Sequence, residues 1–195
     1  MDTMASYRRA QDLLDEVLGA VLEGQWDGPS ACAEWSVRDV AGHVIWGQRQ
    51  LRAWATGVDY TDRSGAPGAP HPRGLAADDP VATWRGARQE ALAVLDEESL
   101  ARLVTLPGLG EVPVAGLIPL LTTDSLAHAW DMGHACGLDV RFDDAVIPGA
   151  FEWAQRNAVR RPGFFGPELD PPADAGEQTR LLAFLGRAAW QPVPA

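Results

Sequence analysis

Hydrophobic residues recur at intervals of three or four positions in several long stretches of the chain, a spacing typical of amphipathic helices. The first such stretch covers residues 5–22 and ends in the turn-forming run GQWDGPS. In the second, Ser36 is followed three positions later by Asp39, which is a helix N-cap signal, and the apolar spacing continues to about Thr56. The pattern therefore predicts two long helices in the first part of the chain.

Residues 57–79 interrupt this pattern with a high density of glycine and proline. That density excludes regular structure, so we expect a long loop, which is either a lid or binding loop or a segment without fixed structure. Asp79 and Pro80 then fit the cap and first turn of a third helix that runs to about Asp96. The loop thus separates the second helix from the third.

The run TLPGLGEVPV, within residues 103–114, is too rich in glycine and proline for a helix and predicts a short extended arm or hairpin. From Ala115 the apolar spacing describes a long fourth helix that stops near Gly137. Short helices are expected at 144–159 and 176–186, separated by the proline-rich run RRPGFFGPELDPP. Four long helices without a strong strand predict an all-α four-helix bundle, whose core can gather ligands from facing helices.

The chain has 195 residues, which suits one domain with a substantial core. We expect this domain to span 1–195, with the bundle at about 5–137 and a C-terminal extension at 138–195. The net charge of −11 repels nucleic-acid phosphates and anionic lipid, so neither is an expected partner. No apolar run approaches the ~18 residues that cross a bilayer, and the N-terminal residues lack signal-peptide features, so we expect a cytoplasmic protein.

The motifs argue against several common kinds of active site. Cys32 and Cys136 are too few for a disulfide framework and form no CxxC pair, so we expect reduced thiols. The sequence has no G-x-S-x-G motif, and on a helix Ser125 projects about 100° away from its neighbour Asp124. No phosphate-binding glycine loop follows a strand. Most of the eight tryptophans are expected in the core, with one or two lining a pocket.

The candidate chemistry lies on the second and fourth helices. Asp124 and His128 are four positions apart, so on a helix their side chains lie about 5–6 Å apart at Cβ and face the same way. Together with His43 they make two imidazoles and one carboxylate, which suit Zn, Ni or Fe(II) and leave coordination positions open for water or substrate. Asp131 is expected to accept the imidazole N–H of His128, although it is also an alternative carboxylate ligand.

The remaining histidines fit this group less well. His134 lies six positions beyond His128, about 600° of helical rotation, and so points away from the ligand face. His71 lies in the long loop and reaches the bundle only if that loop folds over it. An Asp and His pair at this spacing is also often a solvated helix contact worth about 0.2–0.5 kcal/mol. The metal hypothesis therefore depends on His43 converging with the pair.

The segments CAEWSVRDVAGHV and LLTTDSLAHAWDMGHACG resemble the DinB/YfiT-like metalloenzyme superfamily. Within it, the chain is most similar to the metal-binding domain of mycothiol-dependent maleylpyruvate isomerase and to related uncharacterised actinobacterial metal-binding proteins. The arm TLPGLGEVPVAG, the segment PGFFGPE and the closing RLLAFLGR share this likeness. The resemblance implies an up-down-down-up bundle and, by motif, a divalent metal held by His43, Asp124 and His128. Many relatives have His or Glu where this chain has the shorter Asp124.

The resemblance also implies a function. Relatives of known activity bind a low-molecular-weight thiol at the metal. The resemblance therefore implies a transferase or isomerase that directs a mycothiol-type thiol at an electrophilic small molecule. Zinc is the expected metal, with nickel or iron as alternatives. Two hypotheses compete with this function: a metal-dependent hydrolase, and a non-catalytic metal or small-molecule binding module that forms a dimer through exposed bundle faces. Oxygen chemistry at Fe(II) is a minor one.

Overall fold

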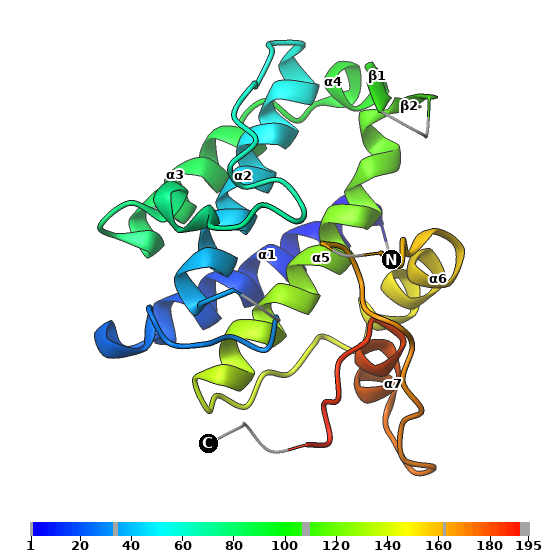
Figure 1. The fold of residues 1–195 in the computed structure, drawn as a ribbon. Coiled ribbons are helices and arrows are strands. Elements are labelled where there is room, and N and C mark those ends of the chain that lie inside the picture. Colours follow the sequence, from blue (N-terminus) through cyan, green and yellow to red (C-terminus); the bar gives the residue numbers. More distant parts are fainter. Residues whose placement is uncertain (1, 33–34, 107–109, 162, 192–195) are drawn as a thin grey trace.

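The computed structural model describes residues 2–32, 35–106, 110–161 and 163–191. Four helices form a bundle (Figure 1): α1 (Thr3–Ala20), α2 (Val37–Thr56), α3 (Pro80–Leu92) and α5 (Val114–Ala135). The shorter elements are η1 (Glu23–Gln25), η2 (Pro72–Ala76), α4 (Glu97–Ala101), β1 (Leu103–Leu106), β2 (Gly110–Pro113), α6 (Ile147–Asn157) and α7 (Glu177–Phe184). The predicted four-helix architecture is confirmed, with boundaries that differ by a few residues.

The helices α1 and α5 lie side by side and run in the same direction. Near the middle of α1, Gln11 Nε2 donates to Ser125 Oγ at 2.6 Å. Closer to the ends of both helices, Val17 packs against Gly133, where an added Cβ would lie 3.5 Å from the valine methyl. Helix α2 packs against both α3 and α5, and the long connection after α2 returns the chain to the start of α3 (Figure 1). The expected up-down-down-up order is confirmed.

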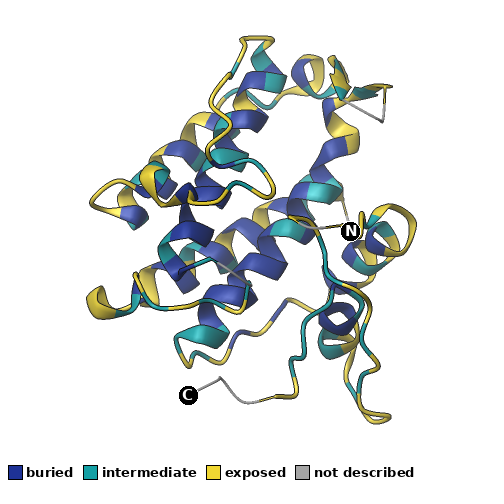
Figure 2. Ribbon diagram, viewed as in Figure 1, coloured by how far each residue is buried: buried dark blue, intermediate teal, exposed yellow. Residues whose placement is uncertain are grey.

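Helix α5 is the central element of the molecule. Every residue from Ser125 to Gly133 is buried, and Figure 2 shows most of the second half of α5 in the colour of buried residues. A helix that is buried on all sides has to be apolar nearly all round, which explains why α5 shows little of the one-sided pattern seen in α1 and α2. Polar groups placed on this part of α5 are therefore held in a packed environment.

Capping residues set the helix boundaries. Ser36 Oγ accepts from the Asp39 amide at 3.1 Å and Asp39 Oδ2 accepts from the Ser36 amide at 3.0 Å, so the predicted N-cap of α2 is a complete capping box. Asp79 caps α3 as predicted. The prediction that this helix reaches Asp96 was wrong, because Asp96 instead accepts from the Ser99 amide and begins the short helix α4.

Two predictions concern the segments between helices. The segment 57–79 was expected to lack regular structure, but Pro72–Ala76 forms the 3₁₀ helix η2, with proline in its first turn where no amide donor is needed. The predicted hairpin is confirmed, since β1 and β2 pair antiparallel with Leu103 opposite Pro113. Its tip, 107–109, lies outside the described residues.

The described part of the C-terminal extension forms a layer against the bundle. Helices α6 and α7 are each shorter than predicted, and α6 packs on α5. Ile147, Leu181 and Leu182 are almost fully buried in the same hydrophobic cluster as α1, α2 and α5 side chains. Within the described ranges, no helix has the length and apolar character that a membrane crossing requires.

Candidate metal centre

His43 of α2 faces Asp124 and His128 of α5 across the bundle. The distance from His43 Nε2 to Asp124 Oδ2 is 3.6 Å, and from His128 Nε2 to Asp124 Oδ1 it is 3.4 Å. Donor atoms bonded to one zinc ion at about 2.0–2.2 Å lie about 3.3–3.6 Å apart in a tetrahedral arrangement. The structure thus brings together three residues that are distant in sequence, at a spacing that fits one cation, and the short Asp124 side chain reaches both imidazoles.

Each imidazole is oriented by an acceptor on its other nitrogen. His43 Nδ1 lies 2.6 Å from the carbonyl oxygen of Gly65, and His128 Nδ1 lies 3.0 Å from Asp131 Oδ2. Since a carbonyl or carboxylate oxygen only accepts, both Nδ1 atoms carry a proton, and each ring presents its Nε2 atom toward Asp124, where a bound metal would replace any proton on Nε2. Asp131 therefore lies where the sequence predicted an acceptor for the His128 N–H.

The carboxylates around His128 make this place attractive to positive charge. Burial alone would lower the pKa of His128, but Asp124 and Asp131 outweigh it and raise that pKa to about 9. Burial likewise would raise the pKa of Asp124, but the two histidines hold it well below its usual range. The Asp124 side chain is 26% exposed, against 7% for each imidazole, so the cluster opens to solvent on the Asp124 side.

Two tryptophans form a wall beside the imidazoles. The Trp35 ring lies 5.0 Å from the His43 ring and 6.2 Å from the His128 ring, centroid to centroid, and Trp46 stacks 6.2 Å from His43. Their indole N–H groups donate to carbonyl oxygens of the long connection, Trp35 to Ala69 at 2.9 Å and Trp46 to Asp62 at 2.7 Å. The segment 57–79 therefore folds against the cluster.

Two glycines let this segment approach α2 closely. An added Cβ on Gly42 would lie 2.0 Å from the carbonyl oxygen of Pro72. An added Cβ on Gly65 would lie 2.3 Å from Cβ of Trp46. Both distances are far inside van der Waals contact, so any side chain at either position would displace the segment. The carbonyl oxygen of Gly65 accepts the hydrogen bond from His43 Nδ1. The close contact with Trp46 therefore holds this acceptor against α2, the helix that carries His43.

Sequence reasoning missed two residues near this cluster. Cys32 lies with His128 and Asp131 in a second group whose potential ligand atoms are within 4.8 Å of one another. Burial, with a smaller contribution from Asp131, raises the pKa of the Cys32 thiol to about 12. Arg187 forms an ion pair with Asp131, and both carboxylate oxygens of Asp131 already accept hydrogen bonds from Arg187 or His128. This second group is therefore the weaker metal candidate. Nothing in the sequence around Arg187 indicated this role; the indirect indication was that Asp131, a carboxylate on a largely apolar helix, needs a cationic partner.

The residues that the sequence pattern did not assign to the ligand set lie away from the proposed ligand atoms. His134 stacks on Trp130 with ring centroids 4.4 Å apart, and it belongs to neither potential ligand group among the described residues. His71 is exposed and precedes η2. Ser125 Oγ donates to the carbonyl of Leu121 and accepts from α1, so it faces away from Asp124 as predicted.

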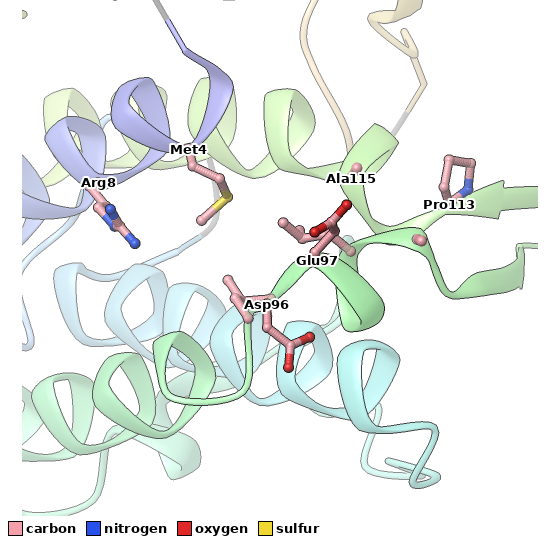
Figure 3. A pocket seen from close by; sticks show the side chains of 9 residues that line it. Met4, Arg8, Asp96, Glu97, Pro113 and Ala115 are labelled. Atoms are coloured by element: carbon pink, nitrogen blue, oxygen red, sulfur yellow. The ribbon is translucent and has the colours of Figure 1, made fainter.

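A surface groove of about 540 Å³ lies elsewhere on the bundle (Figure 3). It is bordered by the first turns of α1 and α5 and by α4, with Met4, Arg8 and Glu97 among its lining side chains. Along α5, its lining residue Ala115 lies nine positions before Asp124, a distance of about 13 Å at about 1.5 Å per residue. The groove is therefore separate from the candidate metal centre.

Known proteins are similar to this chain in sequence or in fold. An uncharacterized protein of Mycobacterium tuberculosis, in strains CDC 1551 and H37Rv, is 33% identical over 199 residues, covering 96% of this chain and 98% of the relative. The crystal structure of the mycothiol-dependent maleylpyruvate isomerase is similar with a TM-score of 0.58 and 15% identity, covering 90% of this chain and 79% of that chain. A histidine-to-alanine mutant of that enzyme gives a TM-score of 0.55 at 14% identity, with the same coverage.

At these low identities, the structural likeness shows a shared fold. The sequence match is more specific, because the family model described as the mycothiol maleylpyruvate isomerase N-terminal domain matches residues 7–133. That range includes α2, the long connection and nearly all of α5, and so contains His43, Asp124 and His128. The chain therefore belongs to the mycothiol maleylpyruvate isomerase N-terminal domain family.

Proposed function

We propose that this protein holds a divalent metal through His43, Asp124 and His128 and uses it to direct a low-molecular-weight thiol at an electrophilic small molecule. The observation that carries the proposal is the convergence of two imidazole Nε2 atoms on one carboxylate, at 3.4 and 3.6 Å, while both Nδ1 atoms are held by acceptors. Nitrogen and oxygen donors of this kind suit zinc, with nickel and iron(II) as alternatives.

The surroundings support a reactive rather than a purely structural centre. Structural zinc sites are usually closed by four protein ligands, whereas three protein donors leave a position for a substrate group. A bound dication would lower the pKa of a coordinated thiol or water toward neutrality. Asp131 keeps the proton on His128 Nδ1, Trp35 and Trp46 lie against the imidazole of His43, and the partly exposed Asp124 gives a substrate a route of access.

The family relationship supports the choice of thiol. The solved enzyme that shares this fold is titled a mycothiol-dependent isomerase, so we assign a mycothiol-type thiol as the cosubstrate and either thiol transfer or isomerisation as the reaction. We also propose that residues 1–195 act as one domain, because α6 and α7 complete the core around α5.

Metal content is the first test. Protein purified without a metal-affinity tag, then loaded with Zn²⁺ and desalted, should contain about one metal ion per chain by elemental analysis. His43→Ala and His128→Ala should reduce that content at least tenfold while helicity by circular dichroism is preserved. His134→Ala is the matched control, since His134 lies on the same helix outside the cluster. Wild-type protein that takes up no Zn²⁺, Ni²⁺ or Fe²⁺ would overturn the metal proposal.

Turnover separates the reactions that the same residues allow. Metal-loaded protein is incubated with mycothiol and a panel of electrophiles, with and without the thiol. A product or isomer that requires both thiol and metal supports the proposed function. A product that forms equally without thiol indicates a metal-dependent hydrolase, and tight thiol or substrate binding without turnover indicates a binding module.

A further inference from the structure

Helix α7 ends in a turn that directs Arg187 back toward the bundle. The Arg187 amide donates to the carbonyl of Leu182 at 2.8 Å, and the Gly186 amide donates to the carbonyl of Ala183 at 2.9 Å. Gly186 has a φ of +84°, the left-handed conformation that this type of helix end requires. An added Cβ there would also lie 2.8 Å from the Cα of Gly166, so the backbone at this point is closely packed.

The guanidinium of Arg187 forms a two-pronged ion pair with Asp131 of α5. Arg187 Nε lies 2.9 Å from Asp131 Oδ1, and Nη2 lies 2.6 Å from Oδ2. A third bond from Nη1 to the carbonyl of Leu185 at 2.9 Å fixes the plane of the guanidinium. The side chain of Arg187 is 10% exposed and that of Asp131 is fully buried, so water competes little for either partner.

The same carboxylate oxygen serves two donors. Asp131 Oδ2 accepts from Arg187 Nη2 and from His128 Nδ1. Because the arginine fork fixes both oxygens, it also fixes the direction from which His128 Nδ1 can donate, and hence the direction of Nε2 on the opposite side of the ring. Without the arginine, Asp131 would be a buried carboxylate whose one remaining side-chain donor among the described residues is the imidazole, an arrangement that favours rearrangement.

We propose that Arg187 is a positioning residue for the candidate metal centre: through Asp131 it holds His128 with Nε2 aimed at the metal position. This inference rests on the proposed function, since it assigns a role toward the metal bound by His43, Asp124 and His128. Arg187 lies beyond the stretch 7–133 matched by the family model. The C-terminal extension thereby supplies part of the support for the site.

The test compares metal affinity in Arg187→Met, Asp131→Asn and the double variant, by titrating Co²⁺ and competing it with Zn²⁺. Each single variant should bind Co²⁺ and Zn²⁺ at least about tenfold more weakly than wild type, which is the loss expected when the partner of a metal-bound histidine is removed. The double variant should lose no more than either single one, because both changes remove the same support. Arg187→Lys keeps the charge without the fork and should fall between wild type and Arg187→Met.

Arg85→Met is the matched control. Arg85 makes the same kind of two-pronged pair with Asp15, at 2.7 and 3.1 Å, between α3 and α1, and its loss should leave the metal affinity unchanged. Wild-type affinity in Arg187→Met would overturn the inference. Losses that add in the double variant would overturn it as well, because they would indicate that Arg187 and Asp131 affect the site independently.

A second readout does not need the metal. In ¹⁵N-histidine-labelled, metal-free protein, the His128 Nδ1 proton should exchange slowly with solvent, and Arg187→Met should accelerate that exchange at least fivefold. If wild-type protein binds no Co²⁺ or Zn²⁺, the metal proposal fails while this exchange rate still decides whether Arg187 orients His128. An unchanged rate in a folded Arg187→Met or Arg187→Lys variant would overturn the positioning role.

Discussion

Gly42 of α2 and Pro72 of η2 are in direct backbone contact, and the contact leaves no room for a side chain on the helix. An alanine within a helix is ordinarily favoured over glycine by about 0.5–1 kcal/mol. We expect the opposite sign for Gly42→Ala, a loss of about 1–3 kcal/mol, because its methyl group would push against a backbone carbonyl. The free energy of unfolding in urea, measured on metal-free protein, checks this.

Gly47→Ala is the control for that experiment. Gly47 lies in the same helix, and an added Cβ there meets nothing within 4 Å. This variant should gain about 0.5–1 kcal/mol from helix propensity alone. Equal effects of the two substitutions would show that η2 does not lie against α2 as described.

The indole of Trp46 holds the long connection through the carbonyl of Asp62. Trp46→Phe keeps the aromatic ring but removes the N–H donor, at a cost of about 1 kcal/mol for one hydrogen bond. Amide hydrogen exchange in residues 57–79 should therefore accelerate roughly fivefold, measured by mass spectrometry of peptides. Trp54→Phe, on the same helix, should leave exchange in this segment at the wild-type rate.

Asp39 makes the stability of the protein sensitive to acid. Burial alone would raise the pKa of Asp39, but hydrogen bonds from Arg73 and Ser36 outweigh it and lower the pKa from 3.8 to about 2. A carboxyl group whose pKa is lower in the folded state stabilises the fold above pH 3.8, and this contribution disappears as the pH falls through 2. Because Arg73 is partly exposed, the contribution is about 1–2 kcal/mol.

The measurement for this prediction is the difference in unfolding free energy between wild type and Asp39→Asn from pH 6 to pH 2. The difference should be largest above pH 4 and shrink toward pH 2. In an Arg73→Met background the pH-dependent part of the difference should become smaller, since the main partner of the carboxylate is gone. A difference that stays constant with pH would contradict the assignment.

Asp124 supplies the only carboxylate among the three proposed ligands. Asp124→Asn preserves the shape of the side chain but removes its charge, so Zn²⁺ affinity should fall at least tenfold, measured by competition with a chromogenic chelator. Asp139→Asn, at an exposed surface position, is the control. Unchanged affinity in Asp124→Asn would remove this residue from the ligand set and leave the two histidines.

Part of the geometry of the candidate site could be predicted from the sequence, because two of its residues carry a local signal. The spacing of Asp124 and His128 gives their common direction on a helix. Their convergence with His43 is a tertiary property, and only the resemblance to known bundles indicated it. Arg187 carried no such signal, since it lies 56 positions from its partner Asp131 and approaches it from another element.

The errors in the fold have physical reasons of the same kind. Glycine and proline density around Pro72 predicted a loop, but the turn of η2 is stabilised by contacts distant in sequence, including the Arg73 amide with Asp39. The third helix was predicted too long because its apolar spacing continues past Leu92, while Asp96 begins a new capped helix. In both cases a capping or tertiary contact outweighs the local pattern.

The long connection accepts hydrogen bonds from three rings, and in each case the acceptor is a main-chain carbonyl oxygen. His43 is bonded to Gly65, Trp46 to Asp62 and Trp35 to Ala69. A peptide carbonyl is present whatever residue occupies the position. At Asp62 and Ala69 the side chain can therefore change during evolution without loss of the hydrogen bond that each carbonyl accepts from an indole. Relatives can in this way differ in sequence along the connection while the His43 ring keeps the same orientation.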